Sequence, residues 1–415
     1  MTAELRTPLP DQPTRTPPAI GPAPALVPVT PQSPTREVSF AVAEVSAQAR
    51  RRVSAVLSSG WLTTGTETLA FEREFASFVG APHAVAVSSC TAAIELSLRA
   101  LGLRRGAAVL TPTITFCGAV HAIVHAGLRP VFVDVDATTL VPRPDQVATA
   151  AARHRPAAMV VQHMAGYPAP VHALAAAAGL PLSRIIEDAA HGLGSSVDGE
   201  QVGAISAATC FSFYATKNLP IGEGGAVTTA DPQLAAFVRC ARLHGMSKDA
   251  WARYLPGGSW EYGVETDGIK ANMSDIQAAI GRGQLVHVER WQRRRASLAA
   301  QYDRLMSGSE VIELPARPAT GAHAWHLYIV RLNTTTARDV VITSLAQRGV
   351  GSSVHFIPAH RFGYFRRLLG EDECATCPEA DAVYPRLLSL PLHPAMTRHD
   401  VTYVCEWLLE ACANQ

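Results

Sequence analysis

Residues 210–231 read "CFSFYATKNLPIGEGGAVTTAD" and contain a single lysine, Lys217. The residues before this lysine have the apolar, aromatic composition of a buried strand, and "GAVTTAD" after it is a second strand candidate. A lysine beside a buried strand is costly unless it is paired or used in chemistry. Lys217 is therefore either a side chain whose ammonium reaches the surface or a nucleophile that forms a Schiff base with a carbonyl cofactor. The hydroxyls of Ser212 and Thr216 and a glycine cluster close by favour the second interpretation, because glycine lets backbone approach a ligand closely.

Further strand candidates precede this stretch, and helical patterns separate several of them. The strand candidates are "HAVAVSS" (83–89), "AAVLTP" (107–112), "PVFVDVD" (130–136), "AAMVVQHM" (157–164), "RIIEDAA" (184–190) and "TCFSFY" (209–214). Between the first two, residues 91–102 ("TAAIELSLRALG") carry apolar side chains at helical spacing and end on a glycine. Strands alternating with helices predict an α/β fold with a mostly parallel sheet covered on both faces.

The character of the sequence changes twice along the chain. Residues 1–36 are rich in Pro, Thr and Ala and predict a disordered arm that cannot bury enough apolar surface to fold. The alternating pattern predicts a large α/β domain over 37–285 and a smaller α+β domain over 286–415. Residues 272–306 predict one long helical stretch, and "AWHLYIVRL" (324–332) predicts a strand in the smaller domain.

The composition is that of a soluble globular enzyme, with 48% hydrophobic and 17% charged residues. A net charge of +1 gives no strong attraction to nucleic acid or membranes, and no apolar run is long enough to span a bilayer. The first residues lack the apolar core of a secretory signal, and eight scattered cysteines are too sparse for a disulfide scaffold. We therefore expect a cytoplasmic protein. No metal site is predicted, because "HAIVH" (121–125) lacks the glutamate of a zincin and "CATCP" (374–378) is a lone CxxC.

Two further stretches carry candidate cofactor ligands. Asp188 in "IIEDAAHGLGSS" ends a very apolar strand, and ligands bind at strand ends in α/β sheets. It is either the acid that keeps a pyridine nitrogen protonated in a pyridoxal phosphate enzyme or an N-cap for the following segment. In "VSSCTAAIEL", Ser89, Thr91 and the backbone near Ala92 either hold a phosphate at a helix N-terminus or form a simple helix cap. Phe116, after the "VLTP" strand end, either stacks on a planar cofactor or belongs to the core.

These stretches together resemble the DegT/DnrJ/EryC1/StrS family of pyridoxal-phosphate-dependent aminotransferases of nucleotide-linked sugars. The resemblance covers the chain from about Val38 to its C-terminus. The matching stretches are "SGWLTTG", "FEREFASFVGAPHAVAVSSCTAAIELSLRALG", "TPTITFCGAVHAIVHAGLRPVFVDVD", "EDAAHGLGS", "SFYATKNLPIGEGGAV", "NMSDIQAAIGRGQL" and "LPLHPAMT". It implies a type I aminotransferase-like fold with a large cofactor-binding domain and a smaller C-terminal domain.

The resemblance assigns catalytic roles residue by residue. Lys217 matches the family lysine that holds pyridoxal 5'-phosphate covalently, and Asp188 matches the partner of the pyridinium nitrogen. His191 stands at the position beside the ring, and Phe116 matches the aromatic side chain that covers the ring face. Some members carry histidine at the lysine position and deoxygenate sugars instead, so Lys217 favours aminotransfer.

The resemblance also implies where the phosphate and the substrate bind. Thr91, Ala92 and Ser212 match the phosphate cradle. Asn272 matches an asparagine that reaches the phosphate of the neighbouring subunit, which implies a homodimer with shared active sites. His355 in "SSVHFIPAH" stands at a position that faces the sugar-nucleotide cleft.

Cys90 departs from the family pattern, which has glycine before the threonine of the phosphate turn. If that turn requires a positive φ, we expect Cys90 to be strained.

The implied reaction moves an amino group from L-glutamate to a keto-sugar nucleotide. The stretches "LHGMSKDAWARY" and "GIKANMSDIQAAI" resemble the branch of the family that acts at a 4-keto group more than the 3-keto branch. Three alternatives stay open at this point: another ketone acceptor such as a 3-keto sugar or a cyclitol, a pyridoxal-dependent sugar dehydratase of the same fold, and a scaffold without catalysis that binds a partner through its Pro-rich arm. The last has no chemical need for Lys217 and Asp188.

Overall fold

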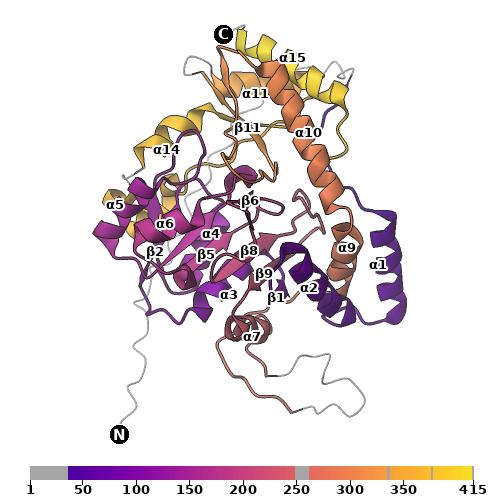
Figure 1. Ribbon diagram of the computed structural model, residues 1–415, viewed down its shortest axis with the longest axis vertical. Coiled ribbons are helices and arrows are strands. Elements are labelled where there is room, and N and C mark those ends of the chain that lie inside the picture. The colour runs from indigo at the N-terminus through magenta and orange to yellow at the C-terminus, as the bar shows by residue number, and fades with distance from the viewer. Residues whose placement is uncertain (1–35, 248–260, 334–336, 375–376, 414–415) are drawn as a thin grey trace, which may run out of the picture. The chain divides into compact units, whose positions relative to one another are not determined.

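The computed structural model describes residues 36–247, 261–333, 337–374 and 377–413. Its largest sheet has seven strands in the order β1-β9-β8-β5-β4-β2-β3 (Figure 1). Within this sheet β9 runs antiparallel to its neighbours β1 and β8, and the other pairs are parallel. The strands are β1 His83–Val87, β2 Ala108–Pro112, β3 Arg129–Val133, β4 Ala158–Gln162, β5 Ile185–Asp188, β8 Ala208–Ser212 and β9 Gly225–Thr229. The predicted α/β fold with a mostly parallel sheet is confirmed.

Helices cover both faces of this sheet, as expected for buried parallel strands. The α-helices are α1 Ala47–Ser59, α2 Thr66–Val79, α3 Cys90–Ala100, α4 Cys117–His125, α5 Pro144–His154, α6 Val171–Ala178, α7 Pro232–Ala241, α9 Asp275–Leu285, α10 Val288–Met306, α11 Arg338–Gln347, α12 Gly363–Leu369, α13 Glu371–Cys374, α14 Pro378–Val383 and α15 Arg398–Ala413. Short 3₁₀ turns lie at Met164–Gly166, Leu182–Arg184, Ala359–Arg361 and Tyr384–Arg386, and a small hairpin joins β6 Ser196–Val197 to β7 Glu200–Gln201.

Successive residues of the strands enter different apolar clusters on the two faces. In β5, Ile186 packs with α3 and α7, whereas Ile185 belongs to the cluster that contains residues of α5 and α6. In β8, Cys210 lies on the first face and Phe211 on the second, where it meets α2 and α9. Side chains point alternately to the two faces of the sheet along a strand. The apolar residues of a strand therefore also determine which face its last, polar residue points to.

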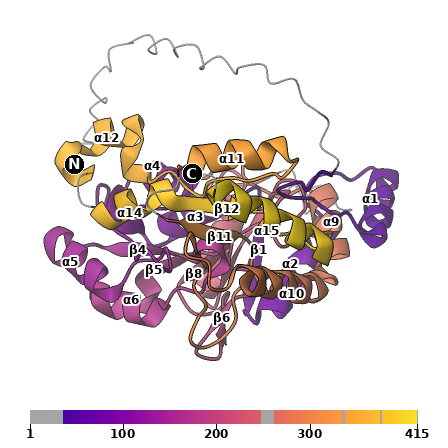
Figure 2. The same ribbon diagram turned by 90° about the horizontal axis from the view of Figure 1, so that it is seen from above.

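A second, three-stranded antiparallel sheet follows in the C-terminal part of the chain. It has the order β10-β11-β12, with β10 Ile312–Glu313, β11 Tyr328–Leu332 and β12 Leu387–Leu390. Figure 2 shows α10, α11 and α15 around this sheet, and their apolar residues form one cluster with it. The two larger sheets thus lie on either side of the predicted boundary at residue 285, and the division into two domains remains a prediction.

The predicted arm, residues 1–36, lies outside the described residues except for Arg36. The Arg36 guanidinium donates through Nε to Asp400 Oδ1 at 2.9 Å, at the start of α15. Among the helices of the described residues, none has the length and apolar character needed to cross a membrane.

Two predicted elements differ from the structure. The strand predicted over 324–332 begins only at Tyr328, because Trp325 has a left-handed φ of +47°, which an extended strand does not allow. The helical stretch predicted over 272–306 is two helices, since α9 ends at Leu285 and α10 begins at Val288, with the His287 N–H bonded to Gln284 O at 2.9 Å in a tighter turn between them. The first difference matters for function, because it turns residues 324–327 into a loop.

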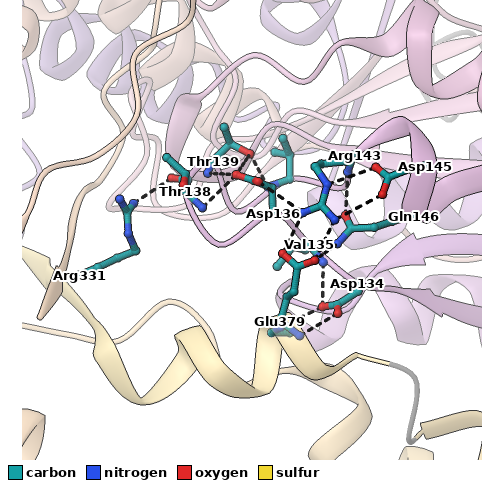
Figure 3. Close-up of polar contacts among 12 residues, drawn as sticks. Asp134, Val135, Asp136, Thr138, Thr139, Arg143, Asp145, Gln146, Arg331 and Glu379 are labelled. Carbon is teal, nitrogen blue, oxygen red and sulfur yellow. Dashed lines mark hydrogen bonds and ion pairs between the residues drawn. The ribbon is translucent and has the colours of Figure 1, made fainter. Parts of the chain in front are cut away.

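Asp134, directly after β3, ties the C-terminal part of the chain to the large sheet (Figure 3). Its carboxylate accepts hydrogen bonds from the backbone N–H groups of Glu379 and Ala380 at the start of α14, each at 2.8 Å. The Arg143 guanidinium donates two bonds of 2.8 Å to the Glu379 carboxylate beside them. A carboxylate at a helix N-terminus satisfies N–H groups that otherwise lack a partner. These bonds fix the chain that leads into β12.

We expect Asp134→Ala to lower the free energy of unfolding by about 1–2 kcal/mol, because two helix N–H groups lose their acceptor. Chemical denaturation followed by circular dichroism measures this change. Asp145→Ala is the matched control, since the Asp145 side chain is 70% exposed and pairs with Arg143 at the surface. Equal effects of the two substitutions would contradict a specific role for Asp134.

Candidate active site

A cavity of about 560 Å³ lies where strands of the large sheet end. The last residues of three adjacent strands line it: Gln162 of β4, Asp188 of β5 and Ser212 of β8. Ligands of open α/β sheets bind at this end of the strands, and the volume is in the range of small-molecule sites. The structure brings seven of the nine predicted site residues to this cavity: Thr91, Phe116, Asp188, His191, Ser212, Lys217 and His355.

Ala92 and Asn272, the other two predicted residues, do not line the cavity. The Ala92 N–H donates to Ser89 Oγ at 3.1 Å, so Ser89 caps α3, which was one of the two interpretations of this turn. Asn272 pairs with Val87 in an isolated bridge, and its Nδ2 donates to Thr64 Oγ1 at 2.8 Å. Its predicted contact is with a neighbouring subunit, and that role stays a prediction.

Lys217 lies in the turn between β8 and β9, and its backbone N–H donates to Tyr214 O at 2.9 Å. Two more backbone bonds close this turn, from Phe213 to Gly224 O at 2.8 Å and from Ile221 to Phe213 O at 2.9 Å. Burial lowers the pKa of Lys217 to about 8, although the negative charge of Asp188 acts in the opposite direction. Near pH 7.5, Lys217 is therefore a neutral amine in a substantial fraction of the molecules. A neutral amine is nucleophilic.

Glycines after Lys217 meet needs of the backbone and of packing within the chain. Gly222 has φ +95°, which favours glycine, and nothing lies within 4 Å of the position of a Cβ atom. At Gly225 a Cβ atom would lie 2.5 Å from the carbonyl carbon of Ser89, so glycine lets β9 pack against the start of α3. The expectation that these glycines let the backbone approach a ligand stays a prediction.

Asp188 is 4% exposed and has few partners for a carboxylate. Its Oδ1 accepts from the Ala190 N–H at 3.0 Å and lies 3.6 Å from the Cys90 Sγ. Burial raises the pKa of Asp188 above its usual value, while the Ala190 N–H and the Lys217 charge oppose the rise. A buried carboxylate so sparsely satisfied is suited to a cationic or hydrogen-bond-donating ligand.

Cys90 carries no positive-φ strain, so the strain expected at this position is wrong. It is the first residue of α3 and takes a helical conformation after the Ser89 cap. Its thiol lies 3.3 Å from Cys210 O besides its contact with Asp188, and burial raises its pKa well above the usual value. Cys90 is therefore a neutral thiol next to Asp188.

His191, His326 and His355 line the cavity with Lys217, and each has a polar partner. His191 Nδ1 accepts from the Ala165 N–H at 3.2 Å, and His355 Nδ1 lies 2.9 Å from Ser389 Oγ. Burial, followed by the Lys217 charge, lowers the pKa of His355 to about 4 and places the pKa values of the other two well below their usual value. The cavity therefore holds three neutral imidazoles.

Sequence reasoning missed several residues that line the cavity. Phe40, Gln162, Glu223, His326 and Phe356 are among them. Gln162 could have been found, because it is a polar residue near the end of the strand predicted over 157–164, and ligands bind at strand ends. His326 lies in a segment that the sequence predicts to be a strand. No sequence pattern predicts the left-handed turn at Trp325 that brings His326 to the cavity.

A model of the DegT/DnrJ/EryC1/StrS aminotransferase family matches residues 44–409 of the chain. The chain belongs to this family. The match spans both larger sheets, most of α15 and all residues that line the cavity except Phe40 and Ala41, so the resemblance found in the sequence is confirmed.

This DegT/DnrJ/EryC1/StrS aminotransferase is similar to known proteins over most of its length. The spore coat polysaccharide biosynthesis protein SpsC of Bacillus subtilis (strain 168) is 43% identical over 360 residues, which are 86% of this chain and 92% of SpsC. Spr1654 of Streptococcus pneumoniae, provisionally assigned as a sugar aminotransferase and solved in its PMP form, has a TM-score of 0.84 and 30% identity over 91% of this chain and 100% of its own. The aminotransferase TlmJ of Streptoalloteichus hindustanus has a TM-score of 0.82 and 32% identity over 91% and 100%.

The cofactor of this DegT/DnrJ/EryC1/StrS aminotransferase is pyridoxal phosphate, and the residues of the cavity fit it. Lys217 supplies an amine of lowered pKa, and Asp188 supplies a buried carboxylate with few partners. Hydroxyls of Thr91 and Ser212 lie at the cavity wall, where a phosphate accepts hydrogen bonds. Gln162 Oε1 is buried and has no hydrogen-bond partner within the described part of the chain, so a ligand group can satisfy it.

Proposed function

We propose that this protein transfers an amino group from L-glutamate to a keto-sugar nucleotide, and that the acceptor is a 4-keto-6-deoxy sugar. The proposal rests first on one observation: an amine with a pKa of about 8, Lys217, shares a cavity with a buried, sparsely bonded carboxylate, Asp188.

Each of these groups has a task that its environment suits. When bound, pyridoxal phosphate supplies an electron sink that stabilises negative charge at the carbon that loses a proton. Asp188 would hold the proton on the pyridine nitrogen, because its carboxylate accepts hydrogen bonds and no cationic side chain of the described residues is bonded to it. Lys217 Nζ, once free, can take a proton from carbon and return it, since its pKa lies near neutral pH. Thr91 and Ser212 would donate to the phosphate.

The acceptor class is supported by the relatives and by the lining of the cavity. SpsC is named for polysaccharide biosynthesis, and Spr1654 is provisionally assigned as a sugar aminotransferase. The aromatic rings of Phe40 and Phe356 line the cavity together with His355, Gln162 and Glu223. Rings beside hydrogen-bonding groups suit a sugar, which presents both C–H faces and hydroxyls. The 4-keto position rests on the sequence resemblance, with a 3-keto sugar or cyclitol ketone as the alternative acceptor.

A homodimer with shared active sites is part of the proposal, and the charge of the cavity supports it. Its expected ligands carry phosphates and carboxylates, yet Lys217 is the sole Lys or Arg among its lining residues in the described chain. At the same cavity, Phe116 is 58% exposed and Tyr214 is 47% exposed, unusual for large aromatic side chains. A second copy of the chain that covers these rings could also bring arginine or asparagine side chains such as Asn272 to the ligand.

The first test is the visible absorption spectrum of the purified protein before and after addition of L-glutamate without acceptor. We expect a yellow protein that loses its visible band as the cofactor takes up the amino group. The aminated protein is then offered 4-keto and 3-keto sugar nucleotides, and return of the band reports transfer. A protein that keeps its band in glutamate would exclude this donor, and return of the band with 3-keto sugars alone would exclude the 4-keto assignment.

A further inference from the structure

His326 contacts the amine of Lys217 from a loop that sequence reasoning assigned to a strand. Its Nε2 lies 3.5 Å from Lys217 Nζ, and the side chain is 6% exposed. The loop reaches the cavity because Trp325 turns the backbone before β11 begins. The other ring nitrogen, Nδ1, lies 3.2 Å from Asn218 Oδ1. The protonation of His326 therefore depends on how the Asn218 amide is oriented.

The Asn218 amide has one orientation because backbone carbonyls fix it. Its Nδ2 donates to Ala324 O at 2.9 Å, and a carbonyl oxygen can only accept. A second acceptor, Gln292 Oε1, lies 3.2 Å from the same Nδ2. Gln292 is fixed in turn, since its own Nε2 donates to His323 O at 3.2 Å. Both amides thus place their nitrogen on a carbonyl, and Asn218 Oδ1 faces His326.

This orientation selects the tautomer of His326. Asn218 Oδ1 is an acceptor, so the Nδ1 of His326 must carry the proton and donate it. A neutral ring with its proton on Nδ1 has a lone pair on Nε2. That lone pair faces the Lys217 amine.

We propose that His326 is a positioning residue for Lys217, and that its Nε2 accepts a hydrogen bond from the Lys217 amine whenever that amine is free. The inference rests on the proposed function to the extent that Lys217 is the reacting amine. One N–H held by a fixed acceptor restricts the rotation of Nζ and leaves its remaining N–H groups or lone pair for the cavity. The bond of 3.5 Å is long, and the four-carbon stem of lysine allows it to shorten.

His326 does not act as a base. Its ring is buried against His191, with 4.5 Å between centroids, and the positive charges of Lys217 and Arg295 face it, with His355 close by. Burial and these charges place its pKa well below the usual value, so a proton shared with Lys217 stays on Nζ. The role left to His326 is to accept a hydrogen bond in one geometry.

Nitrogen-15 NMR of the full-length, cofactor-free protein labelled at histidine tests the tautomer without any substitution. Spr1654 has been solved in its apo form, so a cofactor-free member of the family is a practical sample. We expect His326, assigned by comparison with His326→Gln, to be neutral with its proton on Nδ1 from pH 6.5 to 8.5. A proton on Nε2, or an imidazolium, in this range overturns the proposal.

Reactivity of Lys217 with acetic anhydride, followed by mass spectrometry from pH 6 to 10, tests the contact itself. The chain has only three lysines, Lys217, Lys248 and Lys270, so each acetylated site is resolved. In His326→Leu we expect the acid dissociation constant of the Lys217 ammonium to rise about tenfold, because a charge-assisted hydrogen bond is lost. His326→Gln keeps an acceptor, and we expect it to stay within about threefold of the parent.

His323→Gln is the matched control, because His323 is a buried histidine of the same loop whose Nδ1 accepts from the Trp325 N–H rather than facing Lys217. We expect it to leave the Lys217 titration unchanged. An unchanged titration in His326→Leu, or equal shifts in both loop variants, overturns the proposal. These measurements need neither glutamate nor a sugar, so they fail or succeed independently of the proposed function.

Discussion

Lys217→Ala will leave the protein folded and lower the rate of transamination by at least about a thousandfold, because the proposed function makes Lys217 both the covalent link to the cofactor and the proton-transfer group. The substitution removes a charge that burial disfavours, as the lowered pKa of Lys217 shows, so the fold has no stabilising ion pair to lose. Thr91 and Ser212 remain at the cavity wall, and the variant should still bind pyridoxal phosphate without the covalent link. Steady-state kinetics and reduction with borohydride, which traps only the covalent form, measure the two losses.

Lys270→Ala is the control for Lys217→Ala. Lys270 is exposed, and its Nζ contacts Asn272 Oδ1 outside the residues that line the cavity. We expect this variant to keep the covalent cofactor. Transamination by Lys217→Ala at a rate near that of the parent would show that Lys217 is not the reacting amine.

The sequence predicted the large sheet from local rules, and it predicted the site partly from such rules and partly from the family resemblance. Apolar runs of five or so residues that alternate with helical patterns specify a parallel sheet. Asp188, a polar residue that ends such a run, is thereby placed at the edge of the sheet where ligands bind, whereas Ser212 was assigned to the phosphate by the resemblance. Lys217 could be predicted because an ammonium between two buried strands has few structural uses.

The rest of the site depends on contacts that no local pattern encodes. The position of His326 follows from a left-handed turn at Trp325, a residue type that rarely adopts one. Phe40 reaches the cavity because residues near it pair with a distant segment, with Val38 N–H donating to Gly349 O at 2.8 Å. The strain expected at Cys90, the residue after the Ser89 cap of α3, was wrong. A glycine at this position in the family does not mean that the backbone there has a positive φ.

Asp188→Asn and Glu187→Gln, one residue apart, will separate catalysis from stability. Both carboxylates are buried in β5, but successive side chains of a strand point to opposite faces. Asp188 faces the cavity. Glu187 instead accepts from Thr209 Oγ1 and lies 2.9 Å from His163 Nε2, both within the protein. The His163 ring has its proton on Nε2, because Nδ1 accepts a backbone N–H.

We expect Asp188→Asn to lower transamination by at least about a hundredfold, because a neutral amide cannot supply the negative charge that holds a proton on the cofactor nitrogen. Its stability should not fall. Burial raises the pKa of Asp188, so in the cofactor-free protein the carboxylate disfavours folding, and this cost is present above the folded-state pKa. At pH 7 the cofactor-free variant should therefore melt at or above the temperature of the parent.

Glu187→Gln should do the reverse, with turnover retained and a loss of about 1.5–3 kcal/mol in unfolding free energy, because buried hydrogen bonds to a charged carboxylate are weakened. Burial opposes the ionised form of Glu187, but the hydrogen bonds from His163, Ser206 and Thr209 outweigh burial and lower its pKa. A lowered carboxyl pKa contributes stability above the unfolded-state value that is lost as pH falls through the folded-state value. The variant should thus lose part of the acid dependence of stability below about pH 4.5, whereas Asp188→Asn should not. If instead both variants lost activity in proportion to stability, Asp188 would be a structural residue and the cavity would lack its acid.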